Sequence, residues 1–437
     1  MTIEKRRSAG SNASRRQVLR VATAAATLAA VRAQFPSGAF AQSAGPEVAG
    51  VKLGFIALTD ACPLIIAKDK GFFAKHGMPD VDVTKQASWP ATRDNLALGG
   101  GGGGIDGAHI LSTIPYLMAS GKITQNNNPV PMAMLARLHL DGQSISVSNE
   151  FKEPRVGLDA SPLKAAIAKR KAAGKVFTGA HTFPGGTHDL WIRYWLAAGG
   201  IDPDNDMNLS PVPPPQMVAN MKVGNMDVFC VAEPWHGQLV NQDIGYTAIT
   251  TDEYWPLHPD KSFAMRADWV EKNPKATRAL LMAIFEAQMW CDKPENKREL
   301  AELVGKRQWI NAPVPDILGR LSGDFDFGHG KAGKFPKQMM KYWAEHASFP
   351  WASHDQYMLV ENIRWGKLDA AFDTKGLIAK VSRTDLWRDA AKTLGVAAAE
   401  IPASDSRGVE KFFDGKEFDP ADPMAYLKSL AIKRVKV

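Results

Sequence analysis

Residues 183–200 read FPGGTHDLWIRYWLAAGG, a glycine-rich turn followed by a helix-forming stretch. Thr187 is a candidate N-cap, so His188 is expected to open a helix that Gly199 and Gly200 end. Four residues at helical spacing form its buried face: Leu190, Trp191, Tyr194 and Trp195. A helix start turned by glycine presents unpaired N–H groups and the positive end of the peptide dipoles. Together with His188, it predicts a site for a small anion, or else an ordinary capped helix of an α/β lobe.

The distribution of charge argues against a nucleic-acid partner. The chain has 437 residues, enough for two or three lobes with cores of their own, and a net charge of +7. Residues 1–41 hold seven basic side chains and one acidic one, which is +6 and leaves +1 for the remainder. The basicity therefore belongs to the start of the chain.

That start has the pattern of an export signal. Residues 14–20 read SRRQVLR and resemble the twin-arginine motif, and an alanine-rich apolar run follows from Val21 to Val31. Ala39-Phe40-Ala41 offers a cleavage site of the A-x-A type. The apolar run is too short for a membrane anchor. We therefore expect residues 1–41 to be a twin-arginine signal peptide that takes the folded protein to the periplasm.

The chain has three cysteines, Cys62, Cys230 and Cys291. An odd number without C-x-x-C spacing argues against a disulfide framework or a zinc site. We expect three buried free thiols.

Strand-like runs alternate with helical ones from residue 51 onward, which predicts βαβ units and a mostly parallel sheet. Trp89 lies where a strand over residues 81–86 gives way to a helix, because Pro90 suits the first helical position. Ligands of open α/β sheets bind at the carboxyl ends of strands. Trp89 therefore faces either a cleft or the core.

No catalytic motif is present: the sequence lacks G-x-S-x-G, H-E-x-x-H and paired cysteines, and the glycines at 99–104 lack the lysine and hydroxyl of a phosphate loop. We expect no enzyme activity, no cofactor and no metal. Polar donors collect instead in loops near predicted strand ends: Trp89, Gln143, His188, Lys261 and the backbone N–H of Ala232.

Five motifs, in this order, carry a family resemblance: ASWPATRDN (87–95), GGGIDGAHIL (102–111), PGGTH (184–188), AEPW (232–235) and KSFAMRADWV (261–270). By these motifs the chain from Val51 to Asp369 resembles the periplasmic nitrate-binding proteins of ABC transporters, within the wider nitrate/bicarbonate/cyanate-binding family.

The resemblance implies two α/β lobes of the periplasmic-binding-protein type, with the ligand cleft between them. Lobe I would comprise residues 51–140 and 252–437, and lobe II residues 141–251. The family's anion-binding positions correspond to Trp89, Gln143, His188, Ala232 through its backbone, and Lys261. The sequence departs from the family pattern at Ala232, where glycine is expected.

Lysine at position 261 favours nitrate over bicarbonate. Nitrate has three acceptor oxygens and no proton to donate, so its site needs donors and a compensating cation. Bicarbonate has an O–H group and needs an acceptor, which a carboxylate at this position would supply. The resemblance thus predicts a monomeric receptor that captures nitrate, with nitrite as a second ligand.

The expected partners are a membrane permease and a separate ATPase, and the receptor would contact the membrane only through the permease. Two alternatives stay open. One is a receptor for another small oxyanion, bicarbonate or a sulfonate; the other is a nitrate-sensing regulatory protein.

Overall fold

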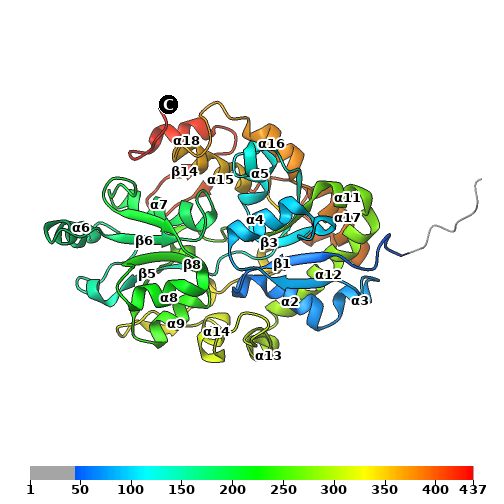
Figure 1. Cartoon of the computed structure of the whole chain (residues 1–437), viewed down its shortest axis with the longest axis horizontal. Coiled ribbons are helices and arrows are strands. Elements are labelled where there is room, and N and C mark those ends of the chain that lie inside the picture. Colours follow the sequence, from blue (N-terminus) through cyan, green and yellow to red (C-terminus); the bar gives the residue numbers. More distant parts are fainter. Residues whose placement is uncertain (1–44, 437) are drawn as a thin grey trace, which may run out of the picture. The chain divides into compact units, whose positions relative to one another are not determined.

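The computed structural model describes residues 45–436 of the chain. This part builds two five-stranded sheets, which Figure 1 shows as a blue-to-cyan group of arrows and a green group. The predicted signal peptide, residues 1–41, lies outside the described residues. No helix between residues 45 and 436 combines the length and the apolarity needed to cross a bilayer.

The first sheet has the strand order β2-β1-β3-β10-β4. Its strands are β1 (Lys52–Phe55), β2 (Asp82–Lys85), β3 (Gly107–Leu111), β4 (Met132–Arg137) and β10 (Lys261–Arg266). β1 pairs in parallel with β2 and β3, whereas β10 runs antiparallel to β3 and β4. The βαβ connections predicted here contain α2 (Cys62–Asp69), α3 (Phe72–Lys75) and α4 (Trp89–Leu98).

The second sheet repeats this plan with the order β7-β6-β8-β5-β9. Its strands are β5 (Gln143–Ser148), β6 (Thr178–His181), β7 (Asn208–Pro211), β8 (Val228–Ala232) and β9 (Gly245–Thr250). β6 is parallel to β7 and β8, and β5 is antiparallel to β8 and β9. The connecting helices are α7 (Thr187–Ala198) and α8 (Pro214–Lys222).

The two mixed α/β sheets confirm the predicted fold class, but parallel pairs are less dominant than expected. Parallel strands need a crossover connection, which the βαβ units supply. The chain instead enters the second sheet directly from β4 to β5 and returns from β9 to β10 through only the short helix α10 (Thr251–Tyr254). The strands at these two crossings are therefore not joined to their neighbours by crossover helices, and β5 and β10 run antiparallel.

The rest of the described chain is mainly helical, as predicted, with two short hairpins. The remaining helices are α5 (Ile114–Ala119), α6 (Leu163–Ala172), α9 (Trp235–Asn241), α10 (Thr251–Tyr254), α11 (Ala267–Lys272), α12 (Pro274–Asp292), α13 (Lys297–Val304), α14 (Val314–Leu321), α15 (Ala352–Arg364), α16 (Thr374–Val381), α17 (Thr384–Leu394) and α18 (Pro423–Ser429). The hairpins are β11 (Asp324–Asp326) with β12 (Ala332–Lys334), and β13 (Glu410–Lys411) with β14 (Glu417–Phe418).

The β11–β12 hairpin follows the first sheet in sequence but packs on the second. The carbonyl of Phe327, in its turn, accepts a hydrogen bond of 2.9 Å from the backbone N–H of Thr247 on β9. Arg155 donates to the carbonyls of Phe327 and Gly328. The segment after α14 therefore forms hydrogen bonds with the second sheet, although it follows the last strand of the first sheet in sequence.

Helix α7 begins one residue earlier than the sequence indicated. Its N-cap is Gly186, and Thr187 is the first helical residue rather than the cap. The Thr187 hydroxyl donates to the Asp260 carboxylate instead, so a tertiary contact replaces the expected local cap. Gly199 ends the helix, as predicted.

The three cysteines are free and buried, as predicted. Burial raises the pKa of Cys62 to about 12, so its thiolate, the reactive form, is suppressed at neutral pH.

Candidate functional site

Three of the five predicted site residues lie at the ends of strands, whereas Trp89 begins α4 and His188 lies in the first turn of α7. Lys261 begins β10 and pairs with Leu111, the last residue of the antiparallel strand β3. Gln143 begins β5 and pairs with Ala232, the last residue of β8. Starting residues of antiparallel strands share an edge with the carboxyl ends of their neighbours, where ligands of such sheets bind.

The structure brings Trp89, His188 and Lys261 together, and all three are fully buried. The Lys261 ammonium lies 3.3 Å from His188 Nε2 and 5.7 Å from the centre of the Trp89 ring. Lys261 and Trp89 come from the first sheet and its helices, whereas His188 comes from α7 of the second. Side chains of both halves therefore meet at one point.

Gln143 and Ala232 form a second group of predicted residues, paired across β5 and β8. Ala232 is the last residue of β8, so its N–H belongs to a strand end and not to a helix start, because α9 begins three residues later at Trp235. Gln143 Nε2 donates to the carbonyl of Asp141, and its Oε1 lies 2.6 Å from His258 Nε2. His139 Nδ1 also binds this carbonyl, so a chain of hydrogen bonds links Gln143 to His139.

The sequence interpretation missed the two carboxylates that flank Lys261. Asp60 Oδ2 lies 3.0 Å from the Lys261 ammonium, and Asp260 forms a second ion pair with it. The sequence offered two signals for these carboxylates. Asp260 immediately precedes Lys261, and Asp60 lies in the turn after the first strand. Neither acid was among the predicted site residues, because an ionised carboxylate cannot donate to an anion.

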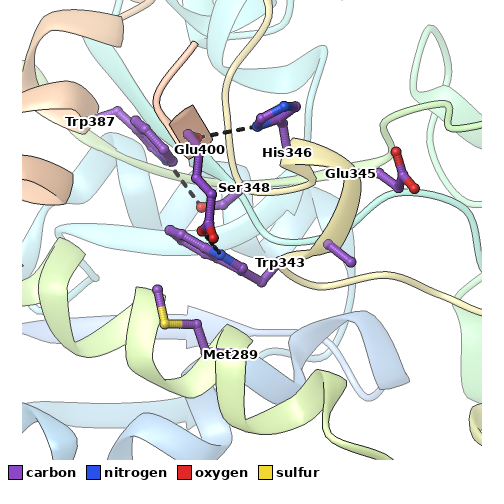
Figure 2. A pocket seen from close by; sticks show the side chains of 8 residues that line it. Met289, Trp343, Glu345, His346, Ser348, Trp387 and Glu400 are labelled. Atoms are coloured by element: carbon purple, nitrogen blue, oxygen red, sulfur yellow. Dashed lines mark hydrogen bonds between the residues drawn. The ribbon is translucent and has the colours of Figure 1, made fainter. Parts of the chain in front are cut away.

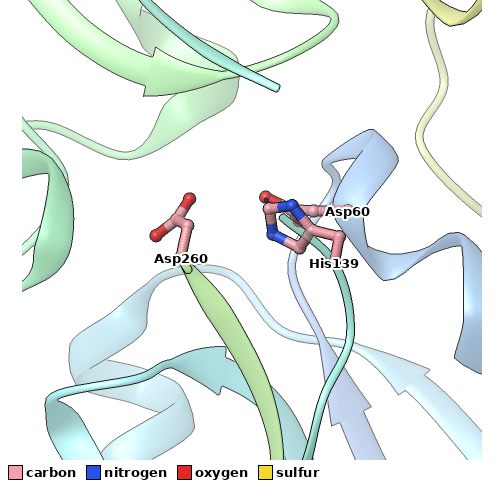
Figure 3. A group of neighbouring side chains, drawn as sticks. All are labelled: Asp60, His139 and Asp260. Carbon is pink, nitrogen blue, oxygen red and sulfur yellow. Dashed lines mark ion pairs between the residues drawn. The ribbon is translucent and has the colours of Figure 1, made fainter. Parts of the chain in front are cut away.

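Figure 3 shows how the acids are placed: Asp260 precedes strand β10, Asp60 comes from the turn after β1, and His139 lies next to Asp60. One ligand atom of each residue lies within 4.8 Å of the others, a spacing that suits a cation. The Lys261 ammonium contacts both carboxylates and supplies that positive charge from within the chain.

Lys261 and the histidines keep both carboxylates ionised. Burial alone would raise the pKa of Asp60, but Lys261 and His109 outweigh it and hold that pKa below its ordinary value. The pKa of Asp260 is likewise lowered well below its ordinary value, because His188 and Lys261 outweigh its burial. The cluster therefore holds an ammonium group between two carboxylates.

Three histidines surround this cluster, and burial lowers the pKa of each. His109 Nε2 lies 2.5 Å from Asp60 Oδ1, while its Nδ1 accepts from the backbone N–H of Ile56. His139, whose pKa falls to about 4, accepts at Nε2 from the backbone N–H of Lys261. His188 Nε2 lies 2.9 Å from Asp260 Oδ2 and its Nδ1 lies 2.7 Å from the Thr182 hydroxyl.

One cavity is lined by a predicted site residue, and a larger one is not. A small one of about 10 Å³ lies beside Gln143 and is lined also by Thr59, Glu233 and Arg320. A larger one of about 510 Å³ is shown in Figure 2, walled by Trp343 and Trp387. None of the five predicted site residues lines the larger cavity.

Comparisons with known proteins identify relatives over most of the chain. The sequence profile of the NMT1-like family matches residues 44–305. The nitrate/nitrite binding protein NrtA of Synechococcus elongatus is 57% identical over 401 residues, which cover 92% of this chain and 90% of the relative. The bicarbonate-binding protein CmpA of the same species is 44% identical and covers 89% of this chain and 88% of its own.

A solved structure agrees with the sequence comparison. The crystal structure of the periplasmic nitrate-binding protein NrtA from Synechocystis superposes with a TM-score of 0.87 at 57% sequence identity. The superposition covers 89% of this chain and 100% of that one. The similarity therefore includes both sheets.

Proposed function

Because the chain belongs to the NMT1-like family, we propose that it is a periplasmic substrate-binding protein that captures nitrate, with nitrite as a second ligand. It would deliver the anion to an ABC-type membrane permease driven by a separate ATPase. The match with this chain covers 90% of the length of the nitrate/nitrite binding protein of Synechococcus elongatus. This coverage supports a receptor of about the same length.

One observation carries the proposal: a buried indole N–H without an acceptor lies beside a buried ammonium group. Within residues 45–436, Trp89 Nε1 has no hydrogen-bond partner, although the Trp89 side chain is fully buried. A buried unpaired donor costs about 1–3 kcal/mol. An oxygen of nitrate next to Lys261 would accept this hydrogen bond and balance the ammonium charge at the same time.

The proposed binding residues are Trp89, Gln143, His188, the backbone N–H of Ala232, and Lys261. Hydrogen bonds to a charged partner contribute about 1.5–3 kcal/mol each. Micromolar affinity requires about 8 kcal/mol. Four or five donors reach this range after the cost of association is subtracted.

Bicarbonate is the second candidate, because Asp60 and Asp260 add acceptors to the site. Nitrate cannot donate to them, whereas the O–H of bicarbonate can. The 44% identity with a bicarbonate-binding protein supports the same alternative. Against it, Lys261 and the histidines already bind both carboxylates.

We keep the proposed lobes at residues 51–140 with 252–437 and 141–251, so that each contains one sheet. Thr59 in the first lobe donates its backbone N–H to the carbonyl of Glu233 in the second at 2.9 Å. Since the site residues are buried, the lobes would open to admit the anion and close over it. The protein would act as a monomer, exported by the twin-arginine signal at residues 1–41.

A thermal-shift panel on the mature protein tests the ligand class. Nitrate, nitrite, bicarbonate, sulfate and methanesulfonate would be added at equal ionic strength. We expect nitrate to raise the melting temperature most, because a ligand that binds only the folded state stabilises it by mass action. A larger shift with bicarbonate or methanesulfonate would replace nitrate as the assigned ligand.

A further inference from the structure

The charges around the proposed site leave no surplus positive charge for an anion. Lys261 lies between Asp60 and Asp260, and Lys341 pairs with Asp141 at 2.7 Å. His258 meets acceptors at both of its ring nitrogens. Its Nε2 lies 2.6 Å from Gln143 Oε1, and its Nδ1 lies 2.9 Å from the carbonyl of Trp255 and 3.1 Å from Asp141.

Two further buried ion pairs lie near the site. Arg137 pairs with Asp355, and Arg320 pairs with Glu233. An entering monovalent anion therefore adds one buried charge without a partner, which is strongly unfavourable in a protein interior. One proton taken up with the anion would restore the balance.

Among the three histidines that contact Lys261 or its carboxylates, hydrogen bonding distinguishes one that can accept this proton without losing a bond. His109 Nδ1 and His139 Nε2 both accept from backbone N–H groups, which cannot reverse. His188 Nδ1 instead meets the hydroxyl of Thr182, which can donate to a neutral imidazole or accept from an imidazolium by rotating its O–H.

We propose that this protein binds its anion together with one proton, which is taken up at His188 Nδ1 and held there by the hydroxyl of Thr182. The inference rests on the proposed function, because it requires an anion next to Lys261. Thr182 is a positioning residue: it lets His188 carry a charge beside the anion while Nε2 stays bonded to Asp260. In this state His188 contributes its charge, and the other four proposed groups supply the hydrogen bonds to the anion. The bound species is then the anion plus a proton, in charge terms its conjugate acid.

The environment of His188 gives the sign of the pH dependence. Burial holds its pKa below the ordinary value although Asp260 and Asp60 oppose this, and Lys261 lowers it further. Two other histidines of the second lobe, His181 on β6 and His236 on α9, lie near enough for a charge on His188 to lower their pKa. His188 is therefore neutral in the free protein at pH 7, and the negative charge of the anion raises its pKa in the complex. The affinity for the anion should therefore fall as the pH rises from the pKa of His188 in the free protein to its pKa in the complex.

Calorimetry of the mature protein with sodium nitrate tests the proposal. Titrations at pH 7.5 in phosphate, HEPES and Tris, which differ in ionisation enthalpy, give the number of protons bound per nitrate. We expect a value near one, and a dissociation constant that rises about tenfold per pH unit from pH 7 to 8. Nitrate binding without proton uptake would overturn the inference and leave the proposed function intact, whereas no nitrate binding at any pH would overturn both.

Two variants locate the proton. Thr182→Val keeps the shape of the side chain but cannot accept from His188, so we expect proton uptake to fall towards zero and nitrate affinity at pH 7.5 to drop at least tenfold. Thr182→Ser retains a hydroxyl and should restore both values, and circular dichroism confirms that each variant is folded. If Thr182→Val binds nitrate with undiminished proton uptake, the proton does not reside at His188. The wild-type titrations show whether a proton is taken up with nitrate even if Thr182→Val fails to fold.

Discussion

Lys261 is the residue on which the site depends, because it is a fully buried ammonium group that contacts two buried carboxylates. Removing one partner of a buried ion pair typically costs about 3–5 kcal/mol, since the remaining charge is uncompensated. The same side chain is the cation closest to Trp89 and His188. Its substitution should therefore affect both stability and binding.

We expect Lys261→Met to abolish measurable nitrate binding and to lower the free energy of unfolding by about 3–5 kcal/mol at pH 7. The loss of stability should shrink at acid pH, because Asp60 and Asp260 can then be neutralised by protons. Titration calorimetry and urea unfolding measure the two effects. Lys272→Met, at an exposed position at the end of α11, is the control and should change neither. Unaltered nitrate affinity in Lys261→Met would remove Lys261 from the site.

At this scale the sequence predicted donors but not their partners. Trp89, His188 and Lys261 were expected from their places near predicted strand ends and from the family resemblance, and the structure places them together. Asp60 and Asp260 could not be inferred from the same reasoning, since two acids beside an anion site contradict it. Only the geometry shows that they hold Lys261 and His188.

At the scale of elements, the turn before α7 places His188. The Gly185 N–H donates to Asp189 Oδ2 at 2.7 Å and its carbonyl accepts from Asn362 at 3.1 Å. Gly185 has a φ of 73°, in the left-handed region, and an added Cβ would collide with Asn362 Oδ1. The turn is therefore held from both sides and tolerates little change.

We expect Gly185→Ala to lower the melting temperature and to weaken nitrate binding, because the turn must move and His188 with it. The matched control is Gly395→Ala at the end of α17, where φ is 86° but no atom lies within 4 Å of an added Cβ. Both variants carry the backbone strain of about 1–2 kcal/mol, and only the first adds the collision. Equal losses of stability and unchanged nitrate affinity in both would show that the turn does not position the site.

Element types were easier to predict than strand directions. Apolar spacing and glycine breaks indicated the alternation of strands and helices from residue 51 onward, including α7. The antiparallel placement of β5 and β10 could not be inferred, because a strand's alternation of polar and apolar residues is the same in either direction. The tertiary bond of Thr187 to Asp260 likewise displaced a local cap that sequence preference favoured.

At the scale of the molecule, the site depends on two sheets that the chain visits in turn. β4 leads into β5 and β9 leads back into β10, so Gln143 and Lys261 each begin a strand directly after a crossing. Later segments add further links, such as the hydrogen bond between Tyr194 on α7 and Asp414 near the C-terminus. This arrangement explains why Trp89 and His188, which are far from Lys261 in sequence, lie beside it.

The most direct test of nitrate capture is a calorimetric titration of the mature protein, residues 42–437, with sodium nitrate at pH 7, alongside a matched titration with bicarbonate. We expect saturable binding of one nitrate per chain with a micromolar or lower dissociation constant, and weaker or undetectable binding of bicarbonate. Tight bicarbonate binding without nitrate binding, or no heat from either anion, would contradict the assignment.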